Sequence, residues 1–203
     1  MQPALILPES VKSFRDYFNL NSPTDEVVEA LGYRFLLAHV ALPKTEAELP
    51  WVAELAERLE DIRPRVSYTI ETARRELLIA PVLMELMRHV DARLRIEYTI
   101  DAGVRLRGEL DYLLVSQHRL LVVEAKNADT ERGMTQLAAE LAALDLWADQ
   151  EESLLYGALS TGTLWHFVTL ERSSKTMTQD IYQFRVPEDL HELSQVLMGI
   201  LEN

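Results

Sequence analysis

The feature that most constrains the fold is a pair of apolar runs, GELDYLLVS and RLLVVEAKN, within residues 108–127. A two-residue turn at Gln117 and His118 would join the runs as an antiparallel hairpin. In that register Leu113 faces Val122, and both faces of the pair carry apolar side chains. Strands that are apolar on both faces lie in the middle of a sheet. We therefore expect a buried hairpin at the centre of a sheet.

The same register brings charged side chains together at the far end of the hairpin. Asp111 would face Glu124, and Glu109 would face Lys126. Directly opposed carboxylates destabilise a sheet, and burial makes the repulsion stronger. A divalent cation with a preference for oxygen ligands, Mg²⁺ or Mn²⁺, would remove that penalty. A solvated ion pair at the strand ends is the alternative interpretation, and the hairpin alone does not decide between the two.

Hydrophobic periodicity predicts the remaining elements. We expect helices at 24–39, 51–62, 69–89, from Thr130 to about 150, and at 187–203, with strands at 93–102, 108–116, 119–127, 153–161, 163–172 and 176–186. Pro81 should kink or divide the third helix. Trp165 and Phe167 alternate on a predicted strand and are expected in the core. The order predicts a mixed α/β fold with a central sheet flanked by helices, in which residues 1–65 form a helical extension packed on a domain at 66–203.

Composition limits the classes of partner and compartment. The net charge is −13, and it is distributed as −6 over residues 1–61, +1 over 62–129 and −8 over 130–203. Strong binding of nucleic acid through bulk charge is therefore not expected. The chain has no cysteine, its five histidines are scattered without ligand spacing, and no apolar run is long enough to cross a membrane. These features favour a cytoplasmic protein without disulfides or a zinc site.

Three stretches together resemble the PD-(D/E)xK nuclease superfamily, whose fold is called restriction-endonuclease-like. They are ETARRELLIAPVL, the hairpin stretches GELDYLL and LVVEAKN, and YGALSTGTLWHFVTL, all within residues 68–172. Within that superfamily the chain looks most like the N-terminal nuclease domain of type I restriction-enzyme motor subunits and related stand-alone proteins. Residues 1–65 have no counterpart in the resemblance.

The resemblance implies hydrolysis of DNA phosphodiester bonds assisted by Mg²⁺ or Mn²⁺. Asp111 and Glu124 would hold the metal with the Ala125 carbonyl, and Glu71 would contribute directly or through water. Lys126 would orient or help deprotonate the attacking water, and Gln136 would help to position water or phosphate.

Several alternatives stay open at this point. Glu71 could be an ordinary residue of a first helical turn, with Glu76 as the second candidate, and Arg74 and Arg75 could bind phosphate or pair with acids. A homodimer would supply two sites for two DNA strands, although no interface signal is present. The alternative function is a non-catalytic protein of the same fold that binds a protein partner through its acidic flanks.

Overall fold

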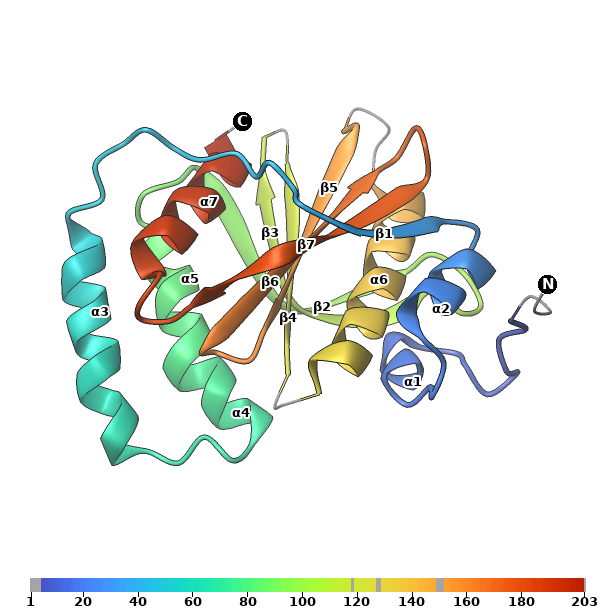
Figure 1. Ribbon diagram of the computed structural model, residues 1–203, viewed down its shortest axis with the longest axis horizontal. Coiled ribbons are helices and arrows are strands. Elements are labelled where there is room, and N and C mark those ends of the chain that lie inside the picture. Colours follow the sequence, from blue (N-terminus) through green and yellow to red (C-terminus); the bar gives the residue numbers. More distant parts are fainter. Residues whose placement is uncertain (1–4, 118, 127–128, 149–151, 203) are drawn as a thin grey trace.

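A seven-stranded mixed sheet forms the middle of the computed structural model, which describes residues 5–117, 119–126, 129–148 and 152–202 (Figure 1). The strand order is β1-β7-β6-β5-β4-β3-β2. The strands are β1 (Arg34–Ala38), β2 (Ala92–Asp101), β3 (Arg107–Ser116), β4 (Leu120–Ala125), β5 (Leu154–Ser160), β6 (Leu164–Glu171) and β7 (Thr176–Arg185). β1 pairs with β7 and β4 with β5 in parallel, and the other neighbours are antiparallel. The expected α/β class is confirmed.

The predicted hairpin is the β3–β4 pair, and it lies inside the sheet between β2 and β5. Leu113 faces Val122, as the register predicted, and the Ser116 N–H donates to the Arg119 carbonyl at 3.0 Å. The predicted turn includes His118, which lies outside the described residues.

Helices cover both faces of the sheet (Figure 1). They are α1 (Phe14–Phe18), α2 (Thr24–Ala30), α3 (Trp51–Ile62), α4 (Glu71–Arg74), α5 (Ala80–Leu86), α6 (Thr130–Trp147) and α7 (Leu190–Glu202), with a 3-10 turn at Arg63–Arg65 and a π-helical turn at Arg75–Ile79. One core joins α3, α5 and α7 to the sheet face that carries Tyr112, Trp165 and Phe167, all buried as expected. The second core joins α1, α2 and α6 to the face that carries Leu113 and Val122. No helix in the described ranges combines the length and apolarity needed to cross a membrane.

The prediction of one helix over residues 24–39 is wrong for its second half, because residues 34–38 form the edge strand β1. The preceding helix stops at a Schellman motif: the Tyr33 N–H donates to the Val28 carbonyl, and the Gly32 N–H donates to the Glu29 carbonyl. Gly32 has a φ of +87°, which a residue with a side chain rarely adopts. The first 65 residues therefore contribute a strand to the sheet as well as helices.

The helix expected at 69–89 runs from 71 to 86 without a break, but it widens before Pro81. The Ala80 N–H donates to the Arg75 carbonyl, five residues back, as in a π-helical turn. Pro81 has no N–H and its ring crowds the preceding turn, which explains why the irregularity lies directly before it. Pro81 thus modifies the helix without dividing it.

Candidate active site

A cavity of about 620 Å³ opens where the charged end of the hairpin meets α1, α4 and α6. Of the residues predicted for the site, five line this cavity: Glu71, Asp111, Glu124, Lys126 and Gln136. Ala125 does not line the cavity and is fully buried. Residues from two strands and two helices, separated by up to 65 positions in the chain, therefore converge on one cavity.

The two acids of the hairpin lie where β3 and β4 separate. Their pairing ends at Tyr112 and Val123, after which the Asp111 side chain accepts the Ala125 N–H at 2.8 Å. β4 instead continues along β5, and the Lys126 N–H donates to the Ser160 carbonyl at 2.8 Å. Asp111 and Glu124 are therefore not register partners as expected, and both line the cavity instead.

Glu124 is only 1% exposed, and it makes an ion pair and hydrogen bond with Lys126. Burial, reinforced by the charge of Asp111 and opposed by Lys126, raises the pKa of Glu124 to about 7. For Lys126, burial favours the neutral amine, but the interaction with Glu124 outweighs it and raises the pKa of the ammonium. Lys126 is therefore charged at neutral pH. Its Nζ also lies 3.9 Å from the Glu71 carboxylate, which is 43% exposed at the mouth of the cavity.

Sequence analysis missed a second buried acid behind the cavity. The Gln136 Nε2 donates to Glu124 at 2.6 Å and to Glu140 at 2.9 Å. Glu140 is fully buried, and burial together with the charge of Glu124 raises its pKa well above the ordinary value. The i to i+4 spacing of Gln136 and Glu140 on a helix was the signal that could have revealed it. Gln136 thus holds two buried carboxyl groups in fixed positions.

The two arginines of the preceding helix have different surroundings. The Arg75 guanidinium lies 3.3 Å from both Asp111 and Glu97, and it also covers the Tyr112 ring at 5.4 Å. Arg74 does not line the cavity, and it donates to the Thr161 carbonyl at 2.8 Å. Of the two, Arg75 is therefore the arginine placed beside the hairpin acids.

The N-terminal segment forms a wall of the cavity that the sequence did not predict. The Phe18 ring lies 5.2 Å from the Lys126 Nζ, a cation–π distance, and Arg15 lies on the same wall. Phe14 packs on Gly108, whose φ is +145° and whose added Cβ would lie 2.9 Å from the Phe14 ring. A residue without a side chain at 108 is therefore what allows this segment to approach β3.

The donor set at the hairpin fits a hard divalent cation. The second carboxylate oxygen of Glu124 is buried and has no hydrogen-bond partner among the described residues, and Asp111 raises the pKa of Glu124 by its charge. A cation between these two carboxylates would relieve both costs. In the described part of the chain, no group of three or more His, Cys, Asp or Glu side chains lies close enough together to hold a metal. The donors would therefore be two carboxylates, completed by water, which is usual for Mg²⁺.

Models of known protein families and curated protein sequences give no match to this chain. What the structure establishes is a mixed α/β protein with two acids, a lysine and a glutamine in one cavity at the end of its central hairpin.

Proposed function

We propose that this chain is an Mg²⁺- or Mn²⁺-dependent nuclease that hydrolyses DNA, with a restriction-endonuclease-like fold of the PD-(D/E)xK type. The observation that carries the proposal is the convergence of Asp111, Glu124, Lys126 and Gln136 on one cavity, together with the buried, unpartnered oxygen of Glu124. A buried carboxylate that is held close to another acid is costly to stability, and such groups concentrate at functional sites.

In the proposed reaction Asp111 and Glu124 would hold the metal, which would supply acidification of a bound water and neutralisation of charge on the phosphate. The Ala125 N–H fixes the Asp111 carboxylate at 2.8 Å, and Gln136 fixes Glu124 at 2.6 Å. Lys126 would orient or help to deprotonate the attacking water, and its charged form would stabilise a phosphate oxygen. Glu71, 43% exposed and 3.9 Å from the Lys126 Nζ, would contribute to holding the metal directly or through water.

The alternative function is a non-catalytic protein that binds a protein partner through its acidic surface. One observation favours it: each acid already has a cationic partner, Asp111 with Arg75 at 3.3 Å and Glu124 with Lys126. The net charge of −13 also suits a protein partner better than a polyanion.

Cleavage of supercoiled plasmid with Mg²⁺ or Mn²⁺ distinguishes the two functions. We expect Asp111→Asn, Glu124→Gln and Lys126→Met each to reduce the rate by about 100-fold or more, because each removes a group that acts on the transition state. Lys44→Met is the matched control for lysine removal, since Lys44 is exposed and pairs with Glu192 far from the cavity.

Calorimetric titration with Mn²⁺ supplies a second readout that needs no substrate. The nuclease proposal requires binding by the wild type and its loss in Asp111→Asn. A wild type that neither binds Mn²⁺ nor cuts plasmid, linear duplex or single-stranded DNA would overturn the proposal and leave the binding function.

A further inference from the structure

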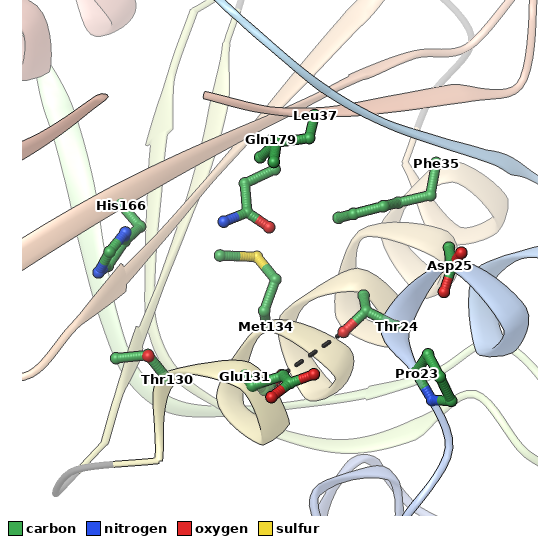
Figure 2. Close-up of a pocket in the computed structure, with 10 residues that line it drawn as sticks. All are labelled: Pro23, Thr24, Asp25, Phe35, Leu37, Thr130, Glu131, Met134, His166 and Gln179. Atoms are coloured by element: carbon green, nitrogen blue, oxygen red, sulfur yellow. Dashed lines mark hydrogen bonds between the residues drawn. The ribbon is translucent and has the colours of Figure 1, made fainter. Parts of the chain in front are cut away.

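A second pocket lies on the opposite side of the first turns of α6 (Figure 2). Its volume is about 480 Å³, and Met134 lines it while Gln136 lines the candidate active site. Two positions along a helix correspond to a rotation of about 200°, so the helix separates the two cavities. Residues that line the second pocket are Pro23, Thr24, Asp25, Phe35, Leu37, Thr130, Glu131, Met134, His166 and Gln179.

Two polar side chains reach the second pocket from the sheet. The His166 Nε2 is buried and has no hydrogen-bond partner among the described residues, and burial lowers the pKa of the imidazole. Gln179 lines the pocket from β7 and points its amide into it (Figure 2). The pairing of β6 with β7 shifts register between His166 and Val168, and such irregularities re-aim side chains. The Gln179 amide therefore points into a space that the His166 imidazole also lines, although the Nε2 of that imidazole is itself covered.

Apolar groups complete the walls. The Phe35 ring lies across the pocket from His166, with the Met134 thioether between them (Figure 2). Met134 is buried while Phe35 is half-buried, so part of the Phe35 ring is accessible from the pocket that it lines. This combination suits a flat ligand with hydrogen-bonding groups at its edge.

The charge of the rim selects among flat ligands. Asp25 and Glu131 are both exposed at the pocket, and none of its ten lining residues is Lys or Arg. A phosphate or carboxylate on the ligand would therefore be repelled.

We propose that the second pocket binds the base of an uncharged nucleoside, with Phe35 stacked on the ring, the Gln179 amide hydrogen-bonded to its edge and the His166 imidazole forming part of the wall. The amide offers both a donor and an acceptor, which every nucleobase edge can use. This site is separate from the proposed hydrolytic site and does not depend on its activity.

Titration of the intact protein with adenosine and cytidine, followed by amide NMR shifts and calorimetry, tests the proposal. We expect saturable binding that Phe35→Ala weakens about tenfold or more, as loss of base stacking does, and that Phe35→Trp restores. Gln179→Leu should weaken binding about two- to tenfold, the usual effect of lost hydrogen bonds. The 5′-monophosphates should bind severalfold more weakly than the nucleosides. The double variant Asp25→Asn, Glu131→Gln should reduce this difference in affinity, because it removes the negative charges at the pocket.

Two controls locate the effect. Gln183→Leu makes the same change on β7 but in a different cavity, beside Tyr182 and Phe184, and should leave binding unchanged. Asp111→Asn alters only the candidate active site and should also leave it unchanged. Absence of saturable nucleoside binding, tighter binding of the monophosphates, or equal affinity of wild type and Phe35→Ala would each overturn the proposal.

Discussion

Replacing Glu124 by glutamine should change how the stability of the protein depends on pH. Glu124 is almost completely buried, and its pKa is raised from 4.5 to about 7 in the folded protein. Between these two pH values the folded state holds a proton that the unfolded chain releases. The stability of the wild type should therefore fall as the pH rises from 4.5 to 7.

The size of the effect follows from the difference between the two pKa values. A rise from 4.5 to about 7 corresponds to roughly 3 kcal/mol of unfolding free energy. The glutamine amide does not titrate, so the variant should not lose this free energy of unfolding as the pH rises. The charge of Glu124 also raises the pKa of Glu140. Removing that charge should therefore also lower the cost of ionising Glu140, which adds to the stability of the variant at high pH.

Urea unfolding followed by tryptophan fluorescence at several pH values between 4.5 and 7.5 measures the difference. At pH 4.5 Glu124→Gln resembles the protonated wild type, and the two should have similar free energies of unfolding. By pH 7.5 the variant should be more stable than the wild type by about 3 kcal/mol. Glu76→Gln, at an exposed position, controls for removal of one negative charge and should differ from the wild type by a constant amount.

The reasoning is refuted if the advantage of Glu124→Gln stays within 1 kcal/mol of its value at pH 4.5, or if it shrinks as the pH rises. Either result would mean that water or Lys126 compensates the buried carboxylate fully. In that case the buried Glu124 carboxylate would not need a cation to be stable.

Three further predictions concern separate parts of the molecule. If the proposed metal site exists, Mg²⁺ should raise the thermal midpoint of the wild type at pH 8 and leave that of Asp111→Ala unchanged, because only the folded protein with both acids would bind it. Gly199→Ala should destabilise the protein by about 1–3 kcal/mol in urea unfolding, despite its better helix propensity, because the new Cβ would lie 2.6 Å from the Pro43 carbonyl oxygen. Asp145→Asn should cost about 3 kcal/mol at pH 7, since it breaks the nearly buried pair with Arg172 at 2.7 Å. Burial opposes ionisation of Asp145, but its hydrogen bonds lower its pKa below 3.8, so that cost should shrink as the pH falls below 3.8.

The sequence predicted the hairpin and its acids well, because their signals are local. Two apolar runs with a short connection fix a register, and that register places Asp111 and Glu124 at the same end. The apolar side chains on both faces of the two strands predicted that the hairpin would be buried, and it lies inside the sheet. Five of the six site residues named in advance reach one cavity, because the elements that carry them were also predicted correctly, whereas Ala125 does not line it.

What the sequence could not reveal depends on contacts between distant segments. Residues 34–38 have a pattern that suits a helix or a strand, and pairing with β7 decides for the strand. Arg75 beside Asp111 and the wall formed by Phe18 arise from packing between elements, for which no local pattern exists. Glu140 is different, because its i to i+4 spacing from Gln136 on one helix was visible in the sequence. One signal was present in the sequence, because Gly32 is typical of the residue that follows the last turn of a helix. It would have predicted the end of this helix correctly.

The pairing of β1 with β7 has a consequence for how the chain acquires its structure. Partners such as Arg34 and Thr176 are more than 140 positions apart, so this edge of the sheet forms only after β7 has been synthesised. Contacts of such long range slow folding and leave early strands exposed in the meantime. On the ribosome, β1 must therefore wait, unpaired, while most of the domain emerges. Phe35, at that edge, reaches its pocket only near the end of the process, so a pocket able to bind a base would be a late mark of complete folding.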